Sequence, residues 1–331
     1  MSEYKITKED GIVVWAPSSP APFLFPKRFK RALDSLNAYG YRNIKIGESC
    51  RKNQFYNGDF AKILAEDFHS YLIDESIKSI FFAVGGWTTS TLFSYIDWEL
   101  VRENKKVIVG YSDATSLLLA CYAKSGMKSF HGPMVISEWG EYGGPWKYTV
   151  EKFEEQLYTE ASYYDLTPPD YWTQERLWWD KEDFRKRSIS GKGEWHFFKG
   201  GKTKGVLIGG NLNTISFLIG TEYMPSLKGA ILFIETEGFS PDKLLAYLMQ
   251  LKFHGVFNEI SGLIIGRHSN PEVTSSGESS FENVLHHMFD EYSFPILLDV
   301  DLGHTEPMIT LPIGGIAMLD SKYNLFRIYK N

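Results

Sequence analysis

The sequence predicts an α/β protein organised around a mostly parallel sheet. In the first half, short apolar runs rich in β-branched and aromatic residues alternate with helical patterns, and from Lys204 onward a second region repeats this alternation. Each apolar run ends at glycine, proline or a polar residue. Strands that alternate with helices form βαβ units, whose ligands gather at the carboxyl ends of the strands. The functional residues are therefore expected at those ends.

The first half contains three clearly patterned strands and two helices. In the first helix, apolar residues recur at spacings of four and three, which places Arg28 on the opposite, charged face. The predicted strands are 11–17, 80–84 and 106–110, and the predicted helices are 26–39 and a segment that begins at Ser112.

The second patterned region has one well-marked helix. Ser240 is its candidate N-cap, Pro241 lies in the first turn, and Gly255 ends the pattern. The predicted strands of this region are 206–208, 230–234, 262–266 and 296–300.

Between these regions, residues 138–200 are rich in tryptophan, tyrosine, glutamate and lysine and show no long periodic segment. Long segments without regular structure are usually lids, binding loops or connectors. We therefore predict an N-terminal α/β domain over 1–150 that carries the nucleophile, a tryptophan-rich linker or substrate loop over 151–203, and a C-terminal domain over 204–331.

The composition excludes several classes of protein. The 331 residues include 35 basic and 41 acidic side chains, a formal net charge of −6, so the chain lacks the positive surplus that nucleic acids attract. A hydrophobic content of 43% is ordinary for a globular protein and argues against disorder. Two cysteines, no apolar leader and no uninterrupted apolar span predict a cytoplasmic protein that binds neither nucleic acid nor membrane.

Ser112 is the candidate nucleophile. It follows the 106–110 strand in the order Gly-Tyr-Ser-Asp-Ala, which is close to the G-x-S-x-G pattern of a nucleophile elbow, with Ala114 in place of the last glycine. The alternative is a plain helix cap, in which the Ser112 side chain accepts a hydrogen bond from the amide of Thr115. The local pattern leaves both interpretations open.

Glu235 and His304 are candidates for the acid–base roles. Glu235 closes the 230–234 strand, where a carboxylate can orient a histidine, and Glu237 is a competitor two residues later. His304 follows Gly303 just beyond the 296–300 strand, and the pKa of a histidine lies near working pH. The alternatives are an exposed turn glutamate and a solvated loop histidine.

Gly85 and Gly86 end the 80–84 strand outside any GxGxxG or Walker pattern. A glycine pair lets backbone N–H groups approach a reacting carbonyl, so the amides of Gly86 and Asp113 are candidates for an oxyanion hole. A tight βα turn is the alternative. No HExxH motif occurs, and the carboxylates near His304 lack a recognisable ligand spacing, so we predict no metal site and no cofactor.

Six segments, taken in order, resemble the LD-carboxypeptidase family of serine peptidases, and within it the branch of microcin C immunity proteins. The resemblance covers nearly the whole chain. The segments are Ala-Pro-Ser-Ser at 16–19, the glycine pair at 85–86, Gly-Tyr-Ser-Asp at 110–113, Gly-Gly-Asn-Leu at 209–212, Leu-Phe-Ile-Glu at 232–235, and Gly-His at 303–304 followed by Thr-Leu-Pro-Ile-Gly at 310–314.

The resemblance implies that Ser112 is the nucleophile, His304 the base and Glu235 the residue that orients the base. It also implies an oxyanion hole formed by the Gly86 and Asp113 amides. The implied fold is an N-terminal flavodoxin-like or Rossmann-like domain with a parallel sheet, followed by a β-rich, swivelling or barrel-like C-terminal domain. A homodimer is implied as well.

The immunity branch is favoured by the motifs at 209–214 and 304–310 and by the long insertion over 138–200. Within the insertion, Trp179 is the best match in spacing to the tryptophan that stacks on the nucleobase in that branch, and Trp178 is the next best. The alternative is that these tryptophans pack the loop against the rest of the protein. We place Gly85, Asn211 and Asn213 among the substrate-binding candidates.

The resulting hypothesis is a serine hydrolase that cleaves the amide between an aminoacyl group and a nucleotide, as in microcin C self-immunity. Its partner would be a small peptide-nucleotide or peptide substrate. One alternative is a murein-tetrapeptide LD-carboxypeptidase, which would be indifferent to Trp179→Ala. A second alternative is an unrelated α/β-hydrolase. A third alternative is a protein that sequesters a nucleotide or peptide without turnover.

Overall fold

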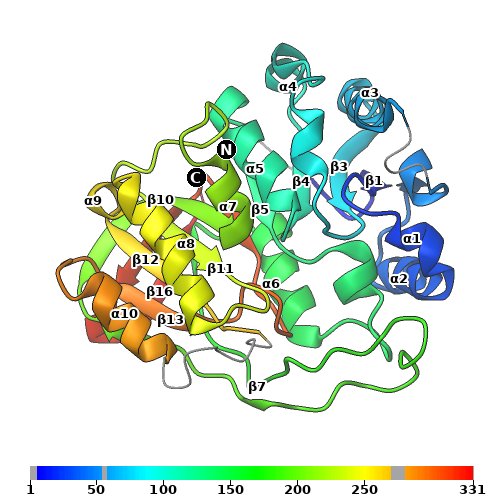
Figure 1. Cartoon of the computed structure of the whole chain (residues 1–331). Coiled ribbons are helices and arrows are strands. Elements are labelled where there is room, and N and C mark those ends of the chain that lie inside the picture. Colours follow the sequence, from blue (N-terminus) through cyan, green and yellow to red (C-terminus); the bar gives the residue numbers. More distant parts are fainter. Residues whose placement is uncertain (1–5, 54–57, 270–279, 331) are drawn as a thin grey trace. The chain divides into compact units, whose positions relative to one another are not determined.

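The computed structural model describes residues 6–53, 58–269 and 280–330 (Figure 1). The chain divides into two compact units that are interleaved along the sequence. Unit 1 comprises Met1–Thr159, Glu175–Ser188 and Met308–Ile313, and unit 2 comprises Glu160–Gln174, Ile189–Pro307 and Gly314–Asn331. The domain boundaries expected at 150 and 203 stay a prediction.

Unit 1 is built on a six-stranded sheet in the order β14-β5-β4-β3-β1-β2. Every neighbouring pair is parallel except β14 with β5, which confirms the predicted α/β class. The strands are β1 (Gly11–Trp15), β2 (Ile44–Ile46), β3 (Ile77–Phe82), β4 (Val107–Gly110), β5 (Ser129–His131) and β14 (Leu311–Ile313).

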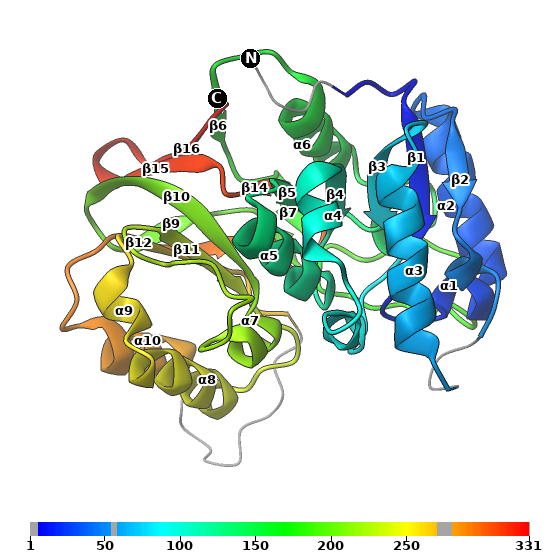
Figure 2. The ribbon, with the colours of Figure 1, turned by 90° about the horizontal axis from the view of Figure 1, so that it is seen from above.

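Helices cover both faces of this sheet. Figure 2 shows α3, α4 and α5 side by side along one face, while α2 and α6 share a hydrophobic core with β1, β3 and β4. The helices of unit 1 are α1 (Ala21–Leu24), α2 (Pro26–Ala38), α3 (Phe60–Ile73), α4 (Trp98–Glu103), α5 (Ala114–Ser125) and α6 (Lys147–Tyr158), with short helical turns at Glu48–Cys50, Thr89–Leu92 and Val135–Trp139.

Helix α6 lies inside the segment that was expected to lack periodic structure, and that expectation is wrong here. Val150, Phe153 and Leu157 recur at helical spacing and are buried in the core of unit 1. The sequence signal was therefore present. It was obscured because the helix carries many charged residues on its other face and ends in an aromatic-rich stretch.

Unit 2 is built on an eight-stranded sheet in the order β6-β16-β15-β10-β11-β12-β13-β9, and it confirms the predicted β-rich second region. Strands β10 to β13 are parallel, and the remaining pairs are antiparallel. The strands are β6 (Tyr163–Leu166), β9 (His196–Lys199), β10 (Lys202–Asn211), β11 (Ile231–Glu235), β12 (Gly262–Gly266), β13 (Ile296–Val300), β15 (Ile316–Asp320) and β16 (Leu325–Tyr329), with a separate pair β7 (Tyr171–Trp172) and β8 (Gly191–Lys192).

The helices of unit 2 lie together on one face of its sheet (Figures 1 and 2). They are α7 (Leu212–Leu218), α8 (Pro241–Phe253), α9 (Val256–Glu259) and α10 (Phe281–Phe289), and a short turn spans Ser321–Tyr323. The predicted cap of α8 is confirmed, since the Ser240 side chain accepts a hydrogen bond from the Lys243 amide at 3.2 Å. In both units, the predicted catalytic and oxyanion-hole residues lie at or just after the carboxyl ends of parallel strands, whereas Trp178 and Trp179 lie in the segment Glu175–Ser188.

Candidate active site

Ser112 lies in a strained turn between strand β4 and helix α5. Its φ of +60° is in the left-handed region, which residues other than glycine seldom adopt. The amide of Thr115 donates to the Ser112 carbonyl oxygen at 3.0 Å, and the N-cap position of α5 is Asp113 rather than Ser112. This geometry is typical of a nucleophile elbow, in which a sharp turn presents the hydroxyl.

The departure from the usual elbow pattern is accommodated locally. Ala114 stands where the last glycine is usual, and a Cβ built on Gly110 would lie 2.8 Å from the Ala114 Cβ. Because Gly110 has no side chain, there is space for the methyl group of Ala114. The missing glycine does not argue against the elbow.

The glycine pair lies directly beside the serine. A Cβ on Gly85 would approach the Ser112 Oγ to 2.9 Å and the Asp113 amide nitrogen to 3.7 Å, and a Cβ on Gly86 would lie 2.2 Å from the Ser18 carbonyl oxygen. Neither position has room for a side chain. The backbone of this loop thus runs against the hydroxyl, as an oxyanion hole requires.

Asp113 fixes the loop that follows the glycine pair. Its carboxylate accepts hydrogen bonds from the amide and hydroxyl of Thr89 at 3.0 and 2.7 Å, and the Thr89 hydroxyl lies 2.6 Å from the Ser18 hydroxyl. All three residues are buried. We call Gly85, Gly86, Ser112 and Asp113 the nucleophile corner of unit 1.

In unit 2, the structure brings Glu235 and His304 together. Glu235 is the last residue of β11 and is fully buried, and its Oε2 lies 2.7 Å from His304 Nδ1. A carboxylate on Nδ1 orients the ring and leaves Nε2 to act on a nucleophile. We call Asn211, Glu235, Glu237, Gly303 and His304 the base corner.

Two neighbours hold Glu235 in place. Asn211 ends β10 opposite Glu235 in the strand register and donates from Nδ2 to Glu235 Oε1 at 2.8 Å. A Cβ on Gly303 would lie 2.6 Å from Glu235 Oε2, so only glycine fits there. Asn211 is buried and also caps α7 through the amide of Thr214. Its predicted contact with substrate stays a prediction.

Glu237 also contacts His304. Its Oε2 lies 2.9 Å from His304 Nε2, so the imidazole has a carboxylate on each side. Burial by itself lowers the pKa of His304, but the two carboxylates outweigh it and raise that pKa to about 10. The spacing argument left Glu235 and Glu237 as competitors. The structure shows that each contacts a different nitrogen.

The segment Glu175–Ser188, here called the tryptophan loop, belongs to unit 1. Trp179 packs edge-on against Phe25, with ring centroids 5.4 Å apart, and the Arg28 guanidinium lies 4.8 Å from its ring. Trp178 is 72% exposed. Of the two tryptophans singled out by spacing, Trp179 therefore packs the loop, and Trp178 is exposed and can contact a ligand.

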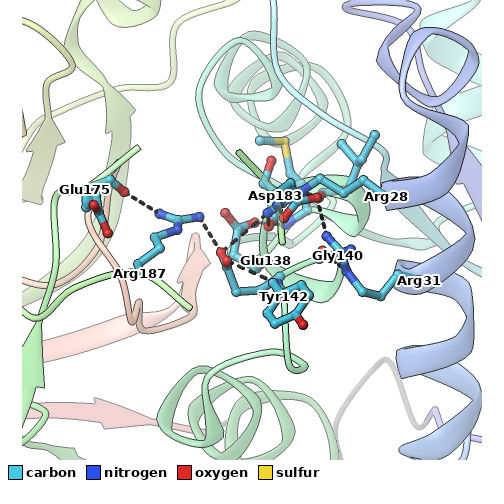
Figure 3. A network of polar contacts seen from close by, with 12 residues as sticks. Arg28, Arg31, Glu138, Gly140, Tyr142, Glu175, Asp183 and Arg187 are labelled. Atoms are coloured by element: carbon cyan, nitrogen blue, oxygen red, sulfur yellow. Dashed lines mark hydrogen bonds and ion pairs between the residues drawn. The ribbon is translucent and has the colours of Figure 1, made fainter. Parts of the chain in front are cut away.

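Buried charges anchor this loop to unit 1 (Figure 3). Asp183 pairs with both Arg28 and Arg31, and Arg187 pairs with Glu141 at 2.5 Å. Arg28, expected on the charged face of α2, is buried: the residue is only 2% exposed, and its side chain donates to the carbonyls of residues 136 and 137. Helical periodicity alone could not reveal an acidic partner 155 residues away.

Other candidates are placed as follows. Asn213 is half-buried, and its Nδ2 lies 3.4 Å from the Tyr247 hydroxyl, so its role in substrate binding stays a prediction. Within residues 6–53, 58–269 and 280–330, no group of three or more histidine, cysteine or carboxylate residues is arranged to hold a metal ion. No helix in this described part of the chain is long and apolar enough to cross a membrane.

Comparison with known proteins identifies the family. The model of the LD-carboxypeptidase N-terminal domain matches residues 12–132, and that of the LD-carboxypeptidase C-terminal domain matches residues 204–319. The microcin C7 self-immunity protein MccF of Escherichia coli is 33% identical over 94% of this chain and 90% of its own length. A probable murein peptide carboxypeptidase of Bacillus subtilis is 28% identical over 96% of this chain and 90% of its own length.

Solved structures agree with these matches. A structure of MccF in complex with aspartyl sulfamoyl adenosine is similar with a TM-score of 0.92 and 31% identity, over 100% of this chain and 99% of that chain. A second MccF structure, with glutamyl sulfamoyl guanosine, has a TM-score of 0.92 and 30% identity over 100% of this chain and 98% of that chain. The likeness extends over the entire chain.

Proposed function

Because this chain belongs to the LD-carboxypeptidase family and is a hydrolase, we propose that it cleaves the amide between an aminoacyl group and a nucleotide. The observation that carries the proposal is the carboxylate-held imidazole, with Glu235 Oε2 2.7 Å from His304 Nδ1. The substrate class is supported by MccF, whose solved structures contain aminoacyl sulfamoyl nucleosides.

In the proposed mechanism, the neutral His304 removes the Ser112 hydroxyl proton at Nε2 while Ser112 Oγ forms a bond to the substrate carbonyl carbon. The proton then passes from Nε2 to the leaving nitrogen as the carbon–nitrogen bond breaks. Water attacks the resulting ester, His304 takes its proton, and Ser112 recovers that proton as the acid is released. The mechanism requires the Ser112 hydroxyl to reach Nε2 of His304.

The remaining residues stabilise charge that develops during the reaction. The amides of Gly86 and Asp113 are proposed to bind the oxyanion, which is supported by the close approach of the glycine loop to the Ser112 hydroxyl. Glu235 stabilises the imidazolium that forms at His304 and is itself held by Asn211. No step needs a metal ion or a cofactor.

We assign stacking on the nucleobase to Trp178 rather than Trp179. Trp178 is exposed, whereas Trp179 is already in contact with Phe25 and Arg28. An aromatic ring stacked on a base contributes about 1–3 kcal/mol. The ion pairs of Asp183 and Arg187 that anchor the tryptophan loop would reduce the entropy that binding costs.

A murein-peptide carboxypeptidase is the second candidate, because a relative with that description spans most of this chain. It would release D-alanine from a murein tetrapeptide and would not depend on Trp178. We further propose a cytoplasmic protein, which the two free, buried cysteines support. The homodimer implied by the family is also a proposal, and light scattering on the purified protein would test it.

The decisive experiment is mass spectrometry of products after incubation with aspartyl sulfamoyl adenosine and, separately, with murein tetrapeptide. We expect the wild type to release aspartate and sulfamoyl adenosine, and Ser112→Ala to lower kcat by about 10⁴-fold or more without loss of folding. Release of D-alanine alone would favour the murein reaction. Stoichiometric binding without turnover would favour a sequestering protein and reject the hydrolase mechanism.

A further inference from the structure

His304 is held in a state that does not suit a general base. A base must begin the reaction neutral at the nitrogen that accepts the proton. In this structure that nitrogen, Nε2, lies 2.9 Å from a Glu237 oxygen, which is the position of a hydrogen bond that a protonated ring donates. With Glu235 on Nδ1, the arrangement favours the imidazolium, whose pKa is raised to about 10.

Two other ionisable groups in the described part of unit 2 have partners other than His304. Asp301 is buried and accepts hydrogen bonds from Arg267 and Trp195. His268 lies 3.0 Å from the Thr236 hydroxyl, and burial lowers its pKa to about 4, which leaves it neutral. The groups that raise the pKa of His304 are Glu235 and Glu237.

The two glutamates differ in how freely they can change partner. Glu235 is fully buried and bonded to Asn211, so it stays in place. The Glu237 side chain is 38% exposed, although its backbone is fixed by a bridge to Ser269 and by the hydrogen bond from the Gly238 amide to the Ser269 carbonyl. Its carboxylate can therefore contact an incoming ligand while these backbone contacts to Ser269 are kept.

We propose that Glu237 is a specificity-determining residue that binds a substrate ammonium group beside the scissile carbonyl and, in doing so, releases Nε2 of His304. This inference rests on the proposed function and names its acyl part as an aminoacyl group with a free α-amine. When the ammonium pairs with Glu237, the imidazolium loses one of its two carboxylates. The Nε2 proton then leaves to solvent water, and His304 becomes able to accept the Ser112 proton.

The first test needs no turnover. NMR titration of the His304 imidazole is measured in the wild type and in Glu237→Gln, with and without alaninamide as a cationic aminoacyl probe. We expect Glu237→Gln to lower the His304 pKa by about 1–3 units, because it removes an opposite charge in contact. Alaninamide should lower the His304 pKa in the wild type and leave it unchanged in Glu237→Gln. N-acetylalaninamide, which has no ammonium group, should leave the His304 pKa unchanged in both proteins. An unchanged pKa in Glu237→Gln overturns the proposal.

The second test follows kcat/KM against pH for aspartyl sulfamoyl adenosine and for its N-acetyl derivative. We expect the wild type to prefer the free amine by about 10-fold or more, the strength of a hydrogen bond to a charged group. In Glu237→Gln this preference should be lost, and the acidic limb of the profile should move to lower pH. Glu237→Asp, with the charge kept, should retain part of the preference.

The controls separate the two proposals. Glu259→Gln changes an exposed carboxylate elsewhere in unit 2 and should leave both the preference and the pH profile as in the wild type. If the wild type cleaves neither compound, the proposed function fails, while the NMR titration still decides the role of Glu237. If the wild type cleaves both amine forms equally well, the proposed function stands and the role of Glu237 is rejected.

Discussion

The nucleophile corner and the base corner hold Ser112 and His304 by different physical means. In the nucleophile corner, Ser112 adopts a left-handed backbone conformation, and the backbone of Gly85 packs closely against its side chain. In the base corner, His304 is held by side-chain charges, with Glu235 and Glu237 on its two nitrogens. Ser112 itself is held by steric contacts, whereas His304 is held by charge.

This difference determines what each corner should respond to. Steric contacts do not depend on protonation, so the turn that holds Ser112 should respond less to pH than the contacts of His304 do. The charge on His304 depends on two carboxylates, so substitutions there should change pH profiles as well as rates. The predictions below test this contrast, beginning with the largest effect.

Glu235→Gln should lower kcat by about 10⁴-fold, because an amide can hold the imidazole in the wrong tautomer and cannot stabilise its charged form. It should also lower the pKa of His304, since it removes one of the carboxylates that raise that pKa. The pH dependence of kcat and an NMR titration of the imidazole measure the two effects.

The matched control is Asn211→Asp, which keeps the size of the Glu235 partner but replaces the donated hydrogen bond with a repulsive charge. It should raise the His304 pKa further and reduce kcat less than Glu235→Gln does. A Glu235→Gln variant with wild-type kcat would mean that Glu237 or another group orients the base.

In the nucleophile corner, Gly86→Ala should lower kcat by about 10²–10³-fold, the effect of losing one oxyanion-hole donor. The new Cβ would lie 2.2 Å from the Ser18 carbonyl oxygen, so the loop and its amide must shift. The pH profile should keep its shape, because no charge near His304 changes. Steady-state kinetics across pH measures this.

Gly126→Ala separates this effect from general loss of stability. Gly126 ends helix α5 in a left-handed conformation with open space around it, so alanine there strains only the backbone. It should lower the melting temperature and leave kcat unchanged. If Gly86→Ala and Gly126→Ala reduce activity in proportion to their melting temperatures, the glycine loop has no direct role in the reaction.

The contrast also explains what the sequence could predict. The parallel sheet follows from short contiguous patterns and was predicted from local residues. The local pattern at Ser112 left an elbow and a helix cap open, and the left-handed φ of Ser112 favours the elbow. The choice between Glu235 and Glu237 could not be made from spacing, because it depends on which nitrogen of His304 each one reaches. The burial of Arg28 could not be predicted for a similar reason, since it depends on Asp183, which is distant in the sequence.

The smallest expected effect concerns the tryptophan loop, where the choice between two adjacent aromatic residues is made by packing. Trp178→Ala should raise KM for aspartyl sulfamoyl adenosine by about 5- to 150-fold, corresponding to 1–3 kcal/mol of stacking, with little change in melting temperature. Trp179→Ala removes the contacts with Phe25 and Arg28 and should instead lower the melting temperature. Trp178→Phe should keep most of the affinity. If the two alanine variants show the opposite pattern, the nucleobase stacks on Trp179, and the loop must leave its packed position to bind it.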